Sequence, residues 1–396
     1  MDVYVVLTIV SILIMLSYLL DLIAHKINVP SVMLLLATGI GIRQVGDYFN
    51  WQVFNFDTII PILGTMGLIL IVFEGALDLE ISRKKIKLTA WAFISALCIL
   101  IFTNIVLAYI FQLITIESFY KCMINALPFS VISSAIAIPS VTKLKEESKE
   151  FIIFESSFSD ILGIILFNFL ISNSHLQFNS FLKLGADMVL LIILAGVCSV
   201  ILVFILSRLK HKIKFFLIIA ILIFVFSIGK VFHLSTLLII LVFGLLLKNI
   251  HKFNFGYFNK YVKYSNYHSD FKRMQQISYE SAFLLKTFFF LIFGYIIDIN
   301  AVFQKEIFIN GGLIFLGIVF CRVVFLWLFG GGKIFPEVFI SPRGLITVLL
   351  YFLIPAEIKL PEVNMAILMF VILSTNITMI LGILGSGRKP KVEEMD

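Results

Sequence analysis

Charge is the property that this sequence has least of. Only 14% of its 396 residues are charged, whereas a soluble globular domain carries roughly 25%. Hydrophobic residues make up 60% of the chain, and the mean hydropathy is +1.07. A soluble fold of this size has too little interior for so much apolar surface, but a bilayer solvates it. The composition therefore predicts an integral membrane protein.

The usual motifs of enzymes and metal sites are also missing. The four cysteines are scattered and show no Cys-x-x-Cys spacing, so neither a zinc site nor a disulfide framework is indicated. The six histidines form no His-Glu-x-x-His pattern, and the Gly-Gly-Gly-Lys run at 330–333 lacks the spacing of a phosphate-binding loop. The sequence favours a protein that is not an enzyme and uses no cofactor.

Long apolar segments are abundant instead. A helix needs about 20 mostly apolar residues to cross a bilayer, and the chain offers thirteen such segments, which predicts an all-α polytopic fold. They run over approximately 3–24, 31–48, 57–77, 88–113, 119–141, 151–173, 184–207, 213–230, 233–250, 281–299, 306–329, 334–355 and 362–385. The polar, basic stretch 251–280 is interpreted as a linker on the cytoplasmic leaflet, with a regulatory segment as the alternative.

Basic residues alternate from loop to loop. Of the 31 Lys and Arg residues, 22 fall in odd-numbered loops or the C-terminal tail, six in even-numbered loops and three within spans. Cytoplasmic loops carry the excess of Lys and Arg. The pattern predicts an odd number of spans, with the N-terminus outside and the tail 387–396 in the cytoplasm. It also explains the net charge of +7 without a nucleic acid partner. We expect the membrane itself to be a bacterial-type inner membrane.

Two segments contain prolines where a helix should continue. These are Pro128 and Pro139 in the fifth segment, and Pro336 and Pro342 in the twelfth. Proline removes a helix donor, and inside a membrane the freed carbonyls need a partner in the bundle or water. They are either ordinary kinks or interrupted helices, which mark a transporter site when they occur at matching places in two halves. The neighbouring Ser and charged residues favour the second interpretation.

The sixth segment carries the most unusual charges. At about 100° per residue, Glu155, Ser156, Ser159 and Asp160 share one broad face over two turns. A carboxylate at such a depth is costly and is functional by default. Glu155 lies near the cytoplasmic end, where solvation is the alternative explanation, whereas Asp160 lies deeper. No second carboxylate stands three or four residues from Asp160, so a hydrolytic pair on this helix is not indicated.

Among the other charged residues of the spans, Glu74, Arg322 and Arg343 are candidates to complete a cluster with these carboxylates. Arginine stays protonated in proteins, so an arginine buried in lipid needs an anion, and Glu155 is the natural candidate. Such a pairing keeps Glu155 ionised and leaves Asp160 as the group that titrates. Glu74 is explained equally well as half of a structural ion pair.

Four motifs, in a fixed order along the chain, resemble those of one family. They are Asn28-Val29-Pro30-Ser31-Val32 with Gly39-Ile40-Gly41, Phe73-Glu74-Gly75-Ala76-Leu77-Asp78-Leu79, Glu155-Ser156-x-x-Ser159-Asp160, and Arg343-Gly344-Leu345-Ile346-Thr347 through Pro355. The chain resembles the monovalent cation:proton antiporters, most closely the bacterial NhaP-like sodium/proton exchangers. The resemblance implies a single domain, 1–386, with an NhaA-type fold and a homodimer. It implies inverted repeats at 1–173 and 213–385, a linker helix at 184–207, and a crossing of segments five and twelve.

The resemblance also implies roles for individual residues. Asp160 is the carboxylate for ion and proton, and Ser156 is a side-chain ligand of the alkali cation. Glu155 pairs with Arg322, with Arg343 in support, and Glu74 lies near the ion pathway. Ser159 stands where the family has Asn or Asp, so one carboxylate fewer than in electrogenic members implies electroneutral exchange. At the break of its fifth span the family commonly has Thr-Asp-Pro; the corresponding residues here are Ala137-Ile138-Pro139, which leaves the backbone carbonyl of Ala137 as a ligand.

The expected function is therefore exchange of a monovalent cation, Na+ first, for H+ by competition at Asp160. Oxygen ligands from Asp160, Ser156, Ser159 and the Ala137 carbonyl suit a hard alkali cation. The alternatives are a K+/H+ exchanger, a non-transporting relative, which Ile138 motivates, and a membrane-embedded glycan-assembly enzyme. The short external loops argue against the enzyme.

Overall fold

The computed structural model describes residues 3–27, 29–49, 59–78, 86–141, 144–173, 215–231, 236–249, 267–330 and 335–385, with positions 189, 193, 196 and 197. Within these ranges the regular structure is helical throughout and no strand occurs. The predicted all-α class is therefore confirmed.

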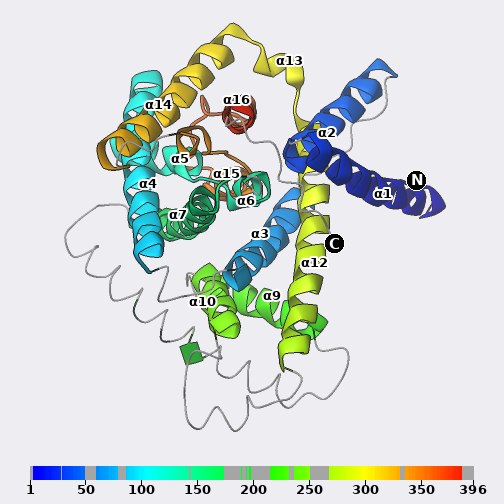
Figure 1. Ribbon diagram of the computed structural model, residues 1–396. Helices are drawn as coiled ribbons and strands as arrows, with labels where there is room; N and C mark the ends of the chain where they lie inside the picture. Colours follow the sequence, from blue (N-terminus) through cyan, green and yellow to red (C-terminus); the bar gives the residue numbers. More distant parts are fainter. Residues whose placement is uncertain are drawn as a thin grey trace. The chain divides into compact units, whose positions relative to one another are not determined.

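The helices follow the apolar segments along the chain (Figure 1). In order they are α1 (Val3–Ile27), α2 (Ser31–Tyr48), α3 (Ile59–Asp78), α4 (Ile86–Thr115), α5 (Phe119–Ser130), α6 (Ser134–Ser140), α7 (Glu146–Ser172), α9 (Phe215–Val231), α10 (Thr236–Asn249), α12 (Tyr267–Ile296), α13 (Ile299–Val302), α14 (Lys305–Phe329), the 3-10 turn η3 (Glu337–Phe339), α15 (Leu345–Leu353) and α16 (Met365–Gly385).

Several of these helices are long and apolar enough to cross a bilayer. Among the described residues there are five, at Ile86–Thr115, Phe119–Ser140, Phe271–Ile296, Lys305–Phe329 and Met365–Gly385. Four shorter apolar helices lie at Val10–Ala24, Ile62–Leu77, Phe216–Gly229 and Ile239–Asn249. The predicted span 184–207 lies outside the described residues except at four positions.

Helix α12 is longer than the sequence analysis predicts. It begins at Tyr267, so the second half of the presumed 251–280 linker is helical, while 251–266 lie outside the described residues. Polar contacts one turn apart support the extension: Gln275 donates to Tyr279 at 2.6 Å, and Gln276 donates to Glu280 at 3.1 Å. Such pairs stabilise a helix face without apolar packing, and a search for apolar runs therefore misses this part of the helix.

The described helices fall into two compact units. The first, here the site unit, spans Met1–Pro61, Leu88–Gly163 and Thr287–Asp396, and the second spans Ile62–Lys87 and Ile164–Lys286. In the second unit α9 packs on α10. The predicted division into inverted repeats remains a prediction.

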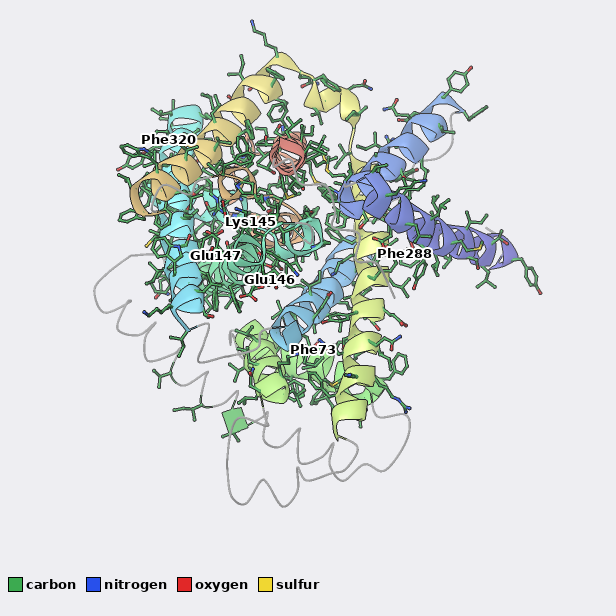
Figure 2. All side chains as sticks on the ribbon, viewed as in Figure 1. Phe73, Lys145, Glu146, Glu147, Phe288 and Phe320 are labelled. Carbon is green, nitrogen blue, oxygen red and sulfur yellow. The ribbon has the colours of Figure 1, made fainter. Side chains whose placement is uncertain are left out.

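Within the site unit the packing surrounds the two broken helices. Helix α14 packs on α16, and α15 packs on α5 (Figure 1). Aromatic contacts join α4 to α14, with the rings of Trp91 and Phe325 stacked at 6.2 Å between centroids. The opposite side of α14 is apolar and exposed, as the outward Phe320 illustrates (Figure 2). An exposed apolar face of this kind suits contact with lipid.

Candidate ion site at the crossing of two broken helices

The fifth predicted span is interrupted three residues after Pro128. Helix α5 ends at Ser130, Val131 and Ser133 are extended, and α6 begins at Ser134. The twelfth span is interrupted between η3 and α15, which begins at Leu345. Both interruptions lie in the site unit.

The two interruptions contact each other through their backbones. The peptide N–H of Ser133 donates to the carbonyl of Pro342 at 2.9 Å. A Cβ added to Gly344 would collide with the side chains of Ser133 and Ile136, so glycine permits this close approach. The interrupted segments therefore form one crossing point, and their unpaired backbone groups satisfy one another there.

Arg343 fastens this crossing. Its guanidinium donates to the carbonyls of Phe129, Ser130 and Ser341. These are carbonyls that the end of α5 and the second interruption leave without helical donors. The sequence analysis groups Arg343 with the Glu155 ion pair, but in the structure its charge is directed to backbone carbonyls instead. The physical reason is that an unwound helix end offers partial negative charge of its own.

Helix α16 binds the backbone of Arg343 through two side chains. The hydroxyl of Thr375 accepts from the peptide N–H of Arg343 at 3.1 Å, and the amide of Asn376 donates to its carbonyl at 2.9 Å. Both side chains are buried. The backbone of Arg343 is thus fixed to α16 while its side chain is fixed to α5.

Asp160 lies on α7 beside the start of α6, and it is only 4% exposed. Its Oδ2 accepts from the peptide N–H of Ser134 at 3.2 Å and from the hydroxyl of the same residue. Its Oδ1 is buried and has no hydrogen-bond partner among the described residues. A buried carboxylate oxygen without a donor is costly, and it marks the atom that a proton or a cation would neutralise.

Glu155 lies about one and a half turns earlier on α7, and both of its carboxylate oxygens accept hydrogen bonds. Its Oε1 and Oε2 each accept from Arg322 at 2.7 Å, and Oε1 also accepts from Ser95 at 2.6 Å. Both members of the ion pair are 1% exposed. Arg322 further donates to the carbonyls of Glu337 and Ile340. The bidentate pair thereby joins α4, α7, α14 and η3.

Ser156 and Ser159 also lie buried on this face of α7. Ser156 donates to the carbonyl of Ile152 at 2.7 Å, within its own helix. Ser159 accepts from the peptide N–H of Ile132 at 2.9 Å, so its hydroxyl caps the first interruption. The lone pairs of Ser156 remain available, whereas one lone pair of Ser159 is taken by the backbone.

The sequence analysis misplaces the interruption of the fifth span. It assigns the break to Ala137-Ile138-Pro139, but these residues are helical within α6, and the chain unwinds at 131–133. Partners outside the fifth span stabilise this position, because the Ser159 hydroxyl and the Pro342 carbonyl accept from the peptide N–H groups of Ile132 and Ser133 in place of helical carbonyls. Ala137 is buried in α6.

Ser134 is the site residue that the sequence analysis does not single out. The available signal was the run of serines at the end of the fifth span, at Ser130, Ser133 and Ser134. Only the fold shows which of them reaches Asp160.

Glu74 belongs to the second unit. Its carboxylate lies 2.9 Å from the ammonium of Lys286 on α12, and both side chains are about one-fifth exposed, at 20% and 18%. Lys286 therefore supplies the ion-pair partner that the sequence analysis left open.

A carboxylate, hydroxyls and unwound carbonyls form a set of oxygen donors. Such donors suit hard cations rather than soft transition metals. Within the described part of the chain, no group of three or more His, Cys, Asp or Glu side chains is placed to hold a metal ion. The arrangement can hold one positive charge, either a proton or an alkali cation, at Asp160.

Comparisons with known proteins agree with this architecture. A sequence profile described as the transmembrane sodium/hydrogen exchanger matches residues 10–386. The sodium proton antiporter MjNhaP1 from Methanocaldococcus jannaschii, solved at pH 8, has a TM-score of 0.70 at 20% identity, covering 97% of this chain and 99% of that one. An electron-microscopy structure of the same antiporter gives a TM-score of 0.65 at 20% identity, covering 99% and 100%. No curated protein sequence matches significantly.

The structural similarity shows the fold, and the profile match covers nearly the whole chain. Members of the matched family are transporters rather than enzymes. The chain is an integral membrane protein that belongs to the sodium/hydrogen exchanger family.

Proposed function

We propose that the protein exchanges Na+ for H+, electroneutrally, by competition of the two ions for Asp160. The observation that carries this proposal is the unequal state of the two buried carboxylates on α7. Glu155 is bonded to Arg322 through both oxygens, whereas Asp160 keeps Oδ1 without a partner among the described residues. The carboxylate of Glu155 is structural, and that of Asp160 is available to bind a proton or a cation.

The charges of the described site support one-for-one exchange. Glu155 and Arg322 cancel each other, so loading changes the charge only at Asp160. A proton or a Na+ ion neutralises this group equally well, and an unloaded carboxylate is costly to carry through a low-dielectric interior. A protein that moves its site across the membrane only when Asp160 is neutral performs obligatory exchange. Ser159 adds no second carboxylate to this count.

The proposed ligands of the cation are Asp160 Oδ1, the hydroxyl of Ser156, carbonyls of the interruptions and water. Ser156 uses its proton toward Ile152 and can therefore direct a lone pair to a cation. Ser159 contributes chiefly by capping Ile132. Ala137 is proposed to act less directly, through the α6 backbone near the site. Glu74 is proposed to lie on the ion pathway.

We further propose a homodimer in a bacterial-type inner membrane, with the N-terminus outside and the C-terminus in the cytoplasm. The alternation of basic loops supports the orientation. The partners of the protein are then Na+, or K+ in the alternative exchanger, together with H+ and the surrounding lipid.

The test is cation-driven proton flux into proteoliposomes, followed with a fluorescent ΔpH probe. Wild type should exchange, Asp160→Asn should not, and clamping the membrane potential to zero should leave the wild-type rate unchanged. Asp298→Asn is the matched control, because this exposed residue caps α13 through Asn300 and asparagine caps equally well.

Flux compared across Li+, Na+ and K+ decides the cation. Undiminished exchange by Asp160→Asn would overturn the proposal.

A further inference from the structure

We propose that Ser134 is the positioning residue that sets the balance between proton and cation at Asp160. This inference rests on the proposed competition at Asp160 and adds the group that biases it.

Both donors of Ser134 reach the same oxygen atom. The peptide N–H lies 3.2 Å from Asp160 Oδ2, and the hydroxyl donates to that oxygen as well. Ser134 is 5% exposed and Asp160 is 4% exposed, so water is largely excluded from these bonds. Ser134 is the first residue of α6, where a peptide N–H has no acceptor within its own helix. Its N–H is therefore available for the carboxylate.

This geometry makes the two carboxylate oxygens unequal. Oδ2 accepts two bonds from one residue, while Oδ1 accepts none from the described residues. The carboxylate plane is thereby fixed against α6, and Oδ1 is the atom left for an incoming ion. A donor to a carboxylate favours its ionised form over the neutral acid. The hydroxyl of Ser134 therefore favours release of the proton and supports binding of the cation.

No other described hydroxyl nearby performs this task. Among the described residues only Ser134 donates to Asp160: Ser130 and Ser156 donate to carbonyls of their own helices, Ser159 accepts from the peptide N–H of Ile132, and the Ser133 hydroxyl has no hydrogen-bond partner. The removal of the Ser134 hydroxyl leaves only the peptide N–H on Oδ2. The carboxylate remains in place, but its ionised form loses a charge-assisted bond.

The experiment compares Ser134→Ala and Ser134→Thr with wild type in proteoliposomes, over a range of pH and Na+ concentration. Ser134→Ala should move the pH profile of exchange upward by about one unit, because a bond to a charged group corresponds to roughly a tenfold change in equilibrium. On the acidic side the apparent KM for Na+ should rise about tenfold. On the alkaline plateau, where the proton no longer competes, KM should return to the wild-type value. Ser134→Thr keeps the hydroxyl and should restore the wild-type profile.

Ser157→Ala is the matched control. Ser157 is a buried serine of α7 whose hydroxyl bonds to Ile153 within its own helix, and it should leave the profile unchanged. A merely structural role of Ser134 would raise KM or lower the maximal rate equally at every pH, which would overturn the inference. An unchanged pH profile in Ser134→Ala would overturn it too. Asp160→Asn, assayed in parallel, separates the two proposals: if that variant still exchanges, the proposed function itself fails.

Discussion

Breaking the buried ion pair between Glu155 on α7 and Arg322 on α14 should strongly destabilise the site unit. Glu155→Leu leaves the guanidinium of Arg322 in a site that is 1% exposed, where its remaining partners among the described residues are the carbonyls of Glu337 and Ile340. Removing one partner of a buried pair costs about 3–5 kcal/mol. Arg322→Met should cost a similar amount, because the Ser95 hydroxyl is then the one donor to Glu155 among the residues that the structure describes.

The double variant distinguishes a coupled pair from two separate contributions. With both charges gone, only neutral groups lose their donors or acceptors, each at a cost of about 1–3 kcal/mol. We therefore expect the double variant to be about 3 kcal/mol more stable than the sum of the single effects predicts. The measurement is the free energy of unfolding in detergent–lipid micelles, from SDS titration followed by circular dichroism.

The exposed pair Arg43–Asp47 on α2 is the control for this cycle. Its atoms lie 2.9 Å apart, but its side chains are 21% and 48% exposed. An exposed pair one turn apart contributes about 0.3–0.5 kcal/mol. If the Glu155–Arg322 cycle gives a coupling no larger than this control, the buried bidentate pair is not what stabilises this part of the site unit.

Substitutions at three further positions test the packing of the site unit. Ser159→Ala leaves the peptide N–H of Ile132 without its acceptor and should cost about 1–3 kcal/mol, whereas Ser159→Asn keeps an acceptor and should cost less; SDS titration measures both. Gly39→Val places a side chain against the backbone of α12 at Leu291, so trypsin should cleave the variant faster than wild type. Asn125→Leu removes the bonds to Ile358 and Leu360, and hydrogen exchange of residues 354–364 should accelerate.

The sequence predicts the site best where the residue type alone requires a partner, as a charged side chain does inside a membrane. Glu155 and Asp160 stand out because carboxylates are costly in an apolar helix, and a buried arginine requires acceptors wherever it lies. The residue type alone does not say which acceptors each arginine takes, and the sequence predicts the partner of Arg322 but not that of Arg343. Arg322 binds Glu155, whereas Arg343 binds the carbonyls of Phe129 and Ser130. These carbonyls lack helical donors because α5 ends at Ser130.

The interruption of the fifth span shows the same limit. Proline signals a local weakness in a helix, and the resemblance to the antiporters places the break at Ala137-Ile138-Pro139. The chain unwinds instead at 131–133, where Ser159 and Pro342 satisfy the backbone. Contacts between residues 27 or more positions apart determine that choice, and a local pattern does not contain them. The contact of Ser134 with Asp160 is hidden for the same reason.

The most direct test of competition at Asp160 is the number of protons released when the purified protein binds Na+. Calorimetric titrations in buffers of different ionisation enthalpy measure this number at each pH. We predict one proton released per Na+ on the acidic side of the exchange profile, none on its alkaline plateau, and no Na+ binding by Asp160→Asn. Binding of Na+ without proton release on the acidic side, or proton-coupled binding that persists in Asp160→Asn, would contradict the account.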